Sequence, residues 1–250
     1  MKTRIPTIIM RQVHLAYGQH VLFDHLNVTF ASNKCSCILG QSGVGKSTLL
    51  KLIAGLIPTQ TSGHISSNND QPLSEQIAYM AQTDLLLPWC SALNNALISA
   101  RLRGKHSTLL RTRAQNLFAQ VGLAGAEKKF PYQLSGGMRQ RVALVRTLLE
   151  DKPIILMDEP FSAVDAITRF KLQTLTATLL KNRTVLLVTH DPTEALRLAD
   201  EIYILSGQPA NLHKIITLNS PAPRDFSHVE IMQQQARLFA ALTNAKEACL

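Results

Sequence analysis

Residues 40–48 read GQSGVGKST, and this stretch decides the fold. It matches the pattern G-x-x-x-x-G-K-[ST], in which a loop joins a strand to a helix and binds phosphate. The apolar run Cys35–Leu39 predicts a buried strand, and the leucines after the loop keep helical spacing as far as Gly55. Backbone N–H groups of such a loop and the N-terminus of the next helix attract phosphate oxygens. We therefore expect a nucleoside triphosphate to bind at Gly40, Gln41, Ser42, Gly43, Val44, Gly45, Lys46, Ser47 and Thr48, with Lys46 on the β- and γ-phosphates and Ser47 on Mg²⁺.

The segments around this loop predict an α/β fold. Residues 7–14 and 21–30 have the pattern of two strands in an antiparallel pair. Residues 154–157 and 185–188 are continuous apolar runs with helical segments between them, which is typical of parallel strands covered on both faces. From Leu93 to Leu149 the strand signals disappear and the apolar residues recur at helical intervals. A helical lobe is therefore expected to be inserted into a parallel-sheet core.

The polar segments set the expected boundaries of these parts. Residues 61–76 are rich in turn formers and leave room for two short strands. The tail predicts a helix from about Val229 to Thr243 after a proline-rich turn. We expect one domain over residues 1–250, made of a core (1–83 and 151–218), a helical subdomain (84–150) and a C-terminal helical tail (219–250).

The composition is that of a folded protein with an excess of positive charge. Of the 250 residues 46% are hydrophobic, which excludes long disordered regions, and the formal net charge is +9. That charge favours anionic partners without choosing among nucleotides, acidic lipids and nucleic acid. The basic residues are scattered along the chain, so we interpret most of them as solvated helix faces.

The cysteines and the apolar runs indicate in which cellular compartment the protein works. Cys35, Cys37, Cys90 and Cys249 show neither metal-ligand spacing nor a disulfide framework, which favours a reducing cytosol. No apolar stretch approaches the roughly 18 to 20 residues that cross a bilayer, and the first residues do not have the pattern of a signal peptide. We therefore expect any association with a membrane to be peripheral.

Two adjacent carboxylates, Asp158 and Glu159, follow the predicted strand at 154–157. Ligand sites of open α/β sheets lie at this end of the strands. Asp158 suits Mg²⁺, held directly or through water, and Glu159 is placed to polarise an attacking water. By itself such a pair is more often a solvated turn, so the prediction depends on the phosphate loop.

A third motif is more discriminating, because many nucleotide hydrolases have the first two. Residues 134–140 read LSGGMRQ, and Ser135 is a natural N-cap for the helical stripe that follows. The two glycines allow a close backbone approach, and a serine, bare N–H groups and a helix dipole together make a second anion site.

Together these motifs resemble the ABC ATPase family, whose signature motif is similar to LSGGMRQR; the resemblance covers about residues 8–210. It implies a P-loop NTPase fold of the ABC cassette type: a parallel-sheet core with an N-terminal antiparallel β part and an inserted helical subdomain. It also implies hydrolysis of ATP, with ATP and Mg²⁺ as ligands. The signature residues implied to bind the ATP of a second copy are Leu134, Ser135, Gly136, Gly137 and Met138.

The same resemblance implies roles for four further residues. Gln82 lies where the family has a glutamine that contacts Mg²⁺ and the attacking water, although an exposed loop glutamine remains an alternative. His190 matches the histidine that contacts the γ-phosphate, and Asp165 ends an S-A-V-D sequence similar to the family's D-loop. Tyr17 aligns with the aromatic residue that stacks on adenine, with an ordinary strand-end tyrosine as the alternative.

Residues 84–90, DLLLPWC, follow Gln82 and contain the only tryptophan of the chain. This apolar run could be part of the core or an exposed docking surface for a partner helix. Their LLPW sequence is similar to that of importer ATPases in the nitrate, sulfonate, taurine and thiamine-pyrimidine-precursor group. The resemblance implies a peripheral subunit on the cytoplasmic face of the inner membrane. Its partners would be a second copy of itself, transmembrane permease subunits and, indirectly, a periplasmic substrate-binding protein.

Two other functions stay open at this point. The chain could serve an exporter, although exporter ATPases are often fused to membrane helices. It could also act on nucleic acid or the ribosome. Chromosome-type relatives insert long coiled coils between the first and third motifs, whereas only 89 positions separate Lys46 from Ser135 here, and ribosome-type relatives carry two cassettes. No nucleic-acid partner is therefore expected.

Overall fold

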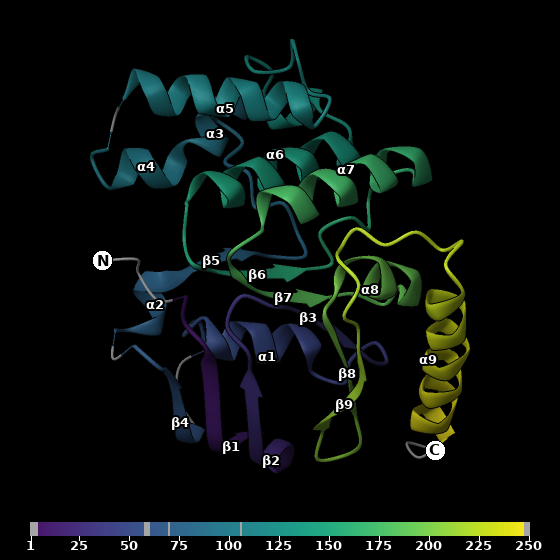
Figure 1. Cartoon of the computed structure of the whole chain (residues 1–250). Helices are drawn as coiled ribbons and strands as arrows, with labels where there is room; N and C mark the ends of the chain where they lie inside the picture. Colours follow the sequence, from purple (N-terminus) through teal and green to yellow (C-terminus); the bar gives the residue numbers. More distant parts are fainter. Residues whose placement is uncertain (1–4, 58–60, 70, 106, 248–250) are drawn as a thin grey trace. The chain divides into compact units, whose positions relative to one another are not determined.

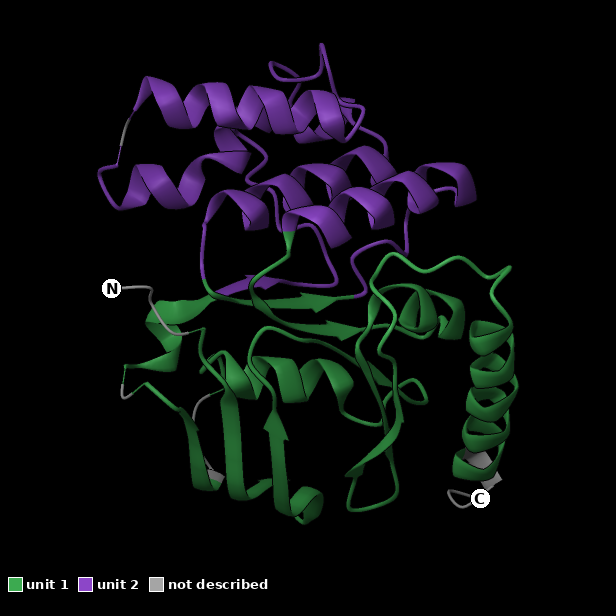
Figure 2. Ribbon diagram, viewed as in Figure 1, with its two compact units in different colours: residues 1–77, 153–158, 180–250 green, residues 78–152, 159–179 purple. Residues whose placement is uncertain are grey.

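A computed structural model describes residues 5–57, 61–69, 71–105 and 107–247. The first residues, which enter the expectation about a signal peptide, and Cys249 lie outside them. Contacts divide the chain into two compact units, which Figure 2 colours separately. The first comprises Met1–Ile77, Pro153–Asp158 and Leu180–Leu250, and the second comprises Ala78–Lys152 and Glu159–Leu179. Residues 159–179 thus group with the helices, whereas the predicted boundaries leave them with the sheet.

The first unit is built on the predicted parallel sheet (Figure 1). Its strands lie in the order β6-β7-β3-β8-β9, and all neighbours are parallel except β8 and β9. Strands β3, β6 and β7 are almost entirely buried, because their runs of apolar side chains are covered on both faces. The strands are β3 (Cys35–Leu39), β6 (Ile154–Asp158), β7 (Thr184–Val188), β8 (Glu201–Ser206) and β9 (Asn211–Thr217).

The predicted antiparallel part is also present in this unit. It has the order β2-β1-β4, with β1 (Ile8–Tyr17), β2 (His20–Phe30) and β4 (Thr61–Ser67). The sequence of residues 61–76 leaves room for a second short strand, but the chain forms the short helix α2 (Leu73–Gln76) there. The amide nitrogen of Gln76 donates to the carbonyl oxygen of Gln71 at 3.0 Å and to Oδ1 of Asn69 at 3.1 Å. These bonds tie Asn69 and Gln71 to the end of the helix, which an extended chain could not do.

Three helices complete the first unit: α1 (Lys46–Ile53), α8 (Pro192–Leu198) and α9 (Val229–Glu247). The tail helix begins where the sequence predicts and continues beyond Thr243 to Glu247. It packs on α8 and on strands β8 and β9 through the buried side chains of Ile231 and Leu238. Just before it, the buried guanidinium of Arg224 donates to the carbonyl oxygen of Ala199 at 2.7 Å, at the end of α8. That bond satisfies a helix-end carbonyl and fixes the start of the tail.

The second unit is the predicted helical lobe. After β5 (Ile77–Met80), which begins at the last residue of the first unit, its described residues form helices only. Helices α3 and α5 pack on α6, whose face of Val142, Val145 and Leu149 is buried. The elements are α3 (Ala92–Ala96), α4 (Ile98–Leu102), α5 (Thr108–Gln120), the 3₁₀ turn η1 (Pro131–Gln133), α6 (Gly136–Leu149) and α7 (Ala166–Leu179).

Candidate functional site

The phosphate-type loop joins β3 to α1, as predicted. Gly43 and Gly45 have φ angles of +83° and +108°, a region that disfavours residues with a side chain. Gly40 is needed for another reason, since a Cβ atom there would meet the carbonyl oxygen of Leu205 at 2.5 Å. The glycines therefore let the backbone turn sharply against β8 and leave its N–H groups at the N-terminus of α1 accessible to an anion.

The ammonium group of Lys46 lies inside this loop. The residue is 7% exposed, and its Nζ donates to the carbonyl oxygens of Gly40 and Gln41, both at 2.8 Å. A positive charge is thus held within a ring of backbone groups, where the terminal phosphates of a nucleotide can meet it.

The tail helix lies beside the same loop. Leu242 and Ala245 of α9, together with Gly40 and Val44 of the loop, line a hollow of about 30 Å³.

The predicted acidic pair follows the buried end of β6. Asp158 is 1% exposed and pairs in register with Val188 of β7. Glu159 is half-buried and has a φ of +48°, which turns the chain sharply after the strand. This left-handed conformation is uncommon for glutamate and marks the position as one that the surrounding structure enforces.

His190 lies at the same edge of the sheet as Asp158. It follows β7 by two residues and is exposed. A helix begins directly after it: Asp191 caps α8 by accepting from the backbone N–H of Thr193 at 2.8 Å, and Pro192 is the first helical residue. The side chain of Glu194 accepts from the hydroxyl of Thr189 at 2.7 Å, which anchors the turn that presents His190.

The serine-glycine motif begins α6, as predicted. The Ser135 hydroxyl accepts from the N–H of Met138 at 3.3 Å, and both Ser135 and Gly136 are exposed. Gly137 is closely packed, because a Cβ atom there would lie 2.9 Å from the carbonyl oxygen of Ala163. The start of this helix is therefore open to an anion on one side and in contact with the turn before α7 on the other.

Asp165 begins α7. Its Oδ1 accepts from the N–H of Thr168 at 3.0 Å, and this hydrogen bond to the charged form lowers the pKa of the exposed carboxyl. The carboxylate therefore stays ionised well into the acidic range, and the N-terminus of α7 favours that charge.

The remaining two candidates, Gln82 and Tyr17, are exposed. Gln82 lies in the loop after β5, and Tyr17 ends β1 with 52% of its surface accessible, next to Gly18 with a φ of +60°. Their accessibility allows contact with a ligand, but it also fits an ordinary loop glutamine and strand-end tyrosine.

The sequence interpretation missed Gln140, which is 5% exposed and bonds the turn at 159–163. One signal could have found it: helical spacing places Gln140 on the same face as Ala143 and Thr147, which are also buried. A polar side chain on a buried face needs hydrogen-bond partners, and the turn supplies them.

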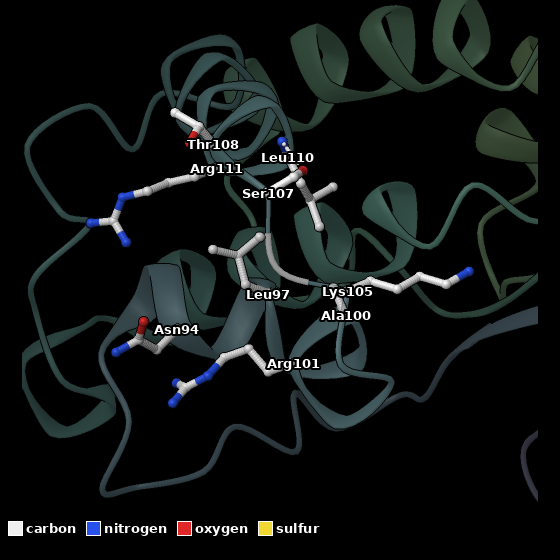
Figure 3. A pocket seen from close by; sticks show the side chains of 9 residues that line it. All are labelled: Asn94, Leu97, Ala100, Arg101, Lys105, Ser107, Thr108, Leu110 and Arg111. Atoms are coloured by element: carbon white, nitrogen blue, oxygen red, sulfur yellow. Dashed lines mark hydrogen bonds between the residues drawn. The ribbon is translucent and has the colours of Figure 1, made fainter.

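The second unit also has a larger hollow, of about 520 Å³, between α3, α4 and the start of α5 (Figure 3). It contains no residue of the motifs above. Its basic side chains Arg101, Lys105 and Arg111 do not converge, and Figure 3 shows Lys105 and Arg111 extending away from one another. This hollow is therefore no candidate for the nucleotide phosphates.

Among the described residues, no three His, Cys, Asp or Glu side chains gather as a metal-binding group. None of the helices that these residues form has the length and apolar character to span a bilayer.

Comparisons with known proteins agree with these motifs. Residues 23–162 match the family described as ABC transporter. The chain is 41% identical over 236 residues to an uncharacterized ABC transporter ATP-binding protein of Haemophilus influenzae, covering 93% of this chain and 97% of that protein. It is 39% identical over 234 residues to the aliphatic sulfonates import ATP-binding protein SsuB 1 of Rhodococcus jostii, covering 93% and 91%.

A solved structure is similar as well. It is a dimeric post-hydrolysis state of the ATP-binding cassette MJ0796 bound to ADP and phosphate. The TM-score is 0.73 at 28% identity, and the match covers 84% of this chain and all of that one.

Proposed function

Because this chain belongs to the ABC transporter family and is an ATP-hydrolysing cassette, we propose that it powers an importer of a small nutrient. The uptake of a sulfonate, nitrate, taurine or thiamine-pyrimidine precursor fits best, since relatives covering most of the chain are named for aliphatic sulfonate import. The observation that carries the importer role is an exposed apolar segment, residues 84–90, that its neighbours hold in place.

We assign the binding of ATP to the phosphate-type loop. Lys46 would exchange its two carbonyl partners for the β- and γ-phosphates, and the N–H groups after Gly43 would surround them. Mg²⁺ neutralises phosphate charge when it is bound. The buried carboxylate of Asp158 and the hydroxyl of Ser47 are oxygen donors of the kind it prefers, with Gln82 as a further donor.

Hydrolysis is assigned to three side chains. Glu159 would accept the proton of the attacking water, while Gln82 would orient that water and His190 would contact the γ-phosphate. These roles follow from the resemblance, and the accessibility of Gln82 and His190 supports them. The solved relatives are dimers, which supports a homodimer, and we propose that Ser135 and Gly137 of one copy bind the ATP of the other.

Residues 84–90 form the docking segment for the permease. Trp89 and Leu85 are 73% and 64% exposed, although both are large and apolar. The backbone beneath them is nevertheless fixed, because Arg146 donates to the carbonyl oxygen of Asp84 at 2.7 Å and the buried Asn95 accepts from the N–H of Leu87 at 2.7 Å. A rigid apolar surface loses little entropy on binding, as expected for a site that receives a short helix of a permease.

Uptake measurements with altered Trp89 test this proposal. In the assembled transporter, Trp89→Ala should reduce uptake at least tenfold, because truncating a central interface tryptophan typically costs about 2 kcal/mol or more. The ATPase rate of the isolated protein should stay within about twofold of wild type, since Trp89 has no assigned role in nucleotide binding. Leu109→Ala is the matched control, as Leu109 is an exposed apolar residue of the same unit, on α5.

The outcomes separate the alternatives. Unchanged uptake by Trp89→Ala would contradict the docking role. We expect this chain to lie on the cytoplasmic face of the membrane. Its purification from the host membrane should recover a permease and a periplasmic binding protein with it. Recovery of an export complex, or a shift of labelled nucleic acid in moderate salt, would favour the corresponding alternative instead.

A further inference from the structure

The buried amide of Gln140 links helix α6, called the signature helix from here on, to the turn that carries Glu159. Its Nε2 donates to the carbonyl oxygen of Glu159 at 2.9 Å and to the hydroxyl oxygen of Ser162 at 3.2 Å. Its Oε1 accepts from the backbone N–H of Ala163 at 2.8 Å. One side chain therefore holds both ends of the turn at residues 159–163.

These contacts determine which way the amide points. The carbonyl oxygen of Glu159 can only accept, and the N–H of Ala163 can only donate, so the Gln140 nitrogen and oxygen must face them respectively. Since the residue is 5% exposed, water has little access to replace a lost bond. The arrangement requires both a donor and an acceptor on the same side chain.

The turn itself needs such support. Glu159 has a φ of +48°, which its own side chain disfavours, and two further bonds to its carbonyl oxygen come from Ser162, at 3.1 Å from the hydroxyl and 3.4 Å from the N–H. The contact of Gly137 with the carbonyl oxygen of Ala163 leaves no space for a side chain between α6 and the turn. Gln140 and Gly137 therefore fix the direction in which the Glu159 carboxylate leaves the backbone.

We propose that Gln140 is a positioning residue for hydrolysis: it holds Glu159 in place from the helix whose first residues bind the partner's ATP. Ser135 and Gln140 are five residues apart on one rigid helix, so a displacement at the start of α6 moves the turn at 159–163 with it. Arrival of the partner's nucleotide would thereby align the glutamate. The proposal rests on the proposed roles of Glu159 and Ser135.

Two substitutions test it in the full-length protein. Gln140→Leu removes both the donor and the acceptor, whereas Gln140→Glu keeps the shape and the acceptor but places a carboxylate oxygen against the Glu159 carbonyl. Both should lower kcat for ATP by about 10- to 100-fold, as misplacement of a catalytic group by about 1 Å does. The KM for ATP and the affinity measured by nucleotide titration should stay within about twofold.

Gln76→Leu is the matched control. Gln76 is a glutamine of similar exposure, 4%, whose amide also makes several hydrogen bonds, to Ser67, Asn69 and Gln71. These three residues have no proposed role in the reaction. Loss of the bonds should lower the melting temperature and leave kcat at 25 °C within about twofold of wild type.

Glu159→Gln is measured beside these variants to separate the two proposals. If Glu159→Gln hydrolyses ATP at the wild-type rate, the assigned role of Glu159 fails, and this inference fails with it. If Glu159→Gln is inactive while both Gln140 variants keep the wild-type kcat, the inference alone is overturned. A failure of both Gln140 variants to fold, or a lower melting temperature with unchanged kcat, would make Gln140 merely structural and would equally overturn it.

Discussion

The two units of the molecule hold their candidate site residues by different means. In the first unit the backbone does this: strand register places Asp158 and the segment before His190 at one edge, and glycines shape the loop around Lys46. In the second unit side chains do it, bonding backbone groups 19 to 23 residues away, as Gln140 does for the turn at 159–163.

This difference predicts which substitutions each unit tolerates. A backbone-shaped loop needs glycine where a Cβ atom would collide, as at Gly40, but depends little on the neighbouring side chains. A turn held by a single amide depends on that amide, because buried donors and acceptors lose their partners together. The signature helix and the docking segment, which Arg146 and Asn95 hold, are of this second kind.

Substitution of Lys46 should have the broadest effect, because it should impair both ATP binding and hydrolysis. Lys46→Ala removes the charge that the loop encloses, and a hydrogen bond to a charged group contributes about 1.5 to 3 kcal/mol. Nucleotide titration should show ATP binding weakened roughly 10- to 100-fold, and phosphate release should be lost with it. Lys51→Ala, at an exposed position of the same helix, should change neither quantity. Wild-type affinity in Lys46→Ala would contradict the assignment of ATP to the first unit.

Substitution of Glu159 should separate the two units most clearly. Glu159→Gln removes a proton acceptor from the second unit and leaves the phosphate loop intact, so hydrolysis should fall by about 10²- to 10⁴-fold. ATP binding should stay within about twofold, and size-exclusion chromatography with ATP should show a stable dimer.

Glu127→Gln is the control for that variant, since Glu127 is also half-buried and belongs to the same unit. It should hydrolyse ATP at the wild-type rate. Loss of ATP binding in Glu159→Gln would contradict the separation of ATP binding at Lys46 from hydrolysis at Glu159.

The contrast also explains how much could be predicted from the sequence. The glycine-rich loop, the strands around it and the caps Ser135 and Asp191 follow from local patterns, and the structure has all of them. Local geometry decides these features, because the interacting groups lie within a few residues of one another.

The bonds of Gln140 could not be predicted in the same way. They join helix α6 to a turn about twenty residues further along the chain, and no local pattern encodes that approach. The helix α2 was missed for a related reason. The Gln76 amide donates hydrogen bonds to Ser67 and Gln71, and strand propensity contains no information about such bonds. Long-range contacts of single polar side chains are what the sequence patterns leave out.

The smallest effect is expected for Tyr17, which tests whether the first unit also binds the base. Tyr17→Ala should weaken ATP binding by about 2- to 10-fold, because aromatic stacking contributes about 0.5 to 1.5 kcal/mol and half of this side chain is exposed to water. Tyr17→Phe keeps the ring and should bind ATP like wild type, while kcat should be unchanged in both. If Tyr17→Ala binds as tightly as Tyr17→Phe, the residue is an ordinary strand-end tyrosine, and the contribution of the first unit is confined to the phosphates.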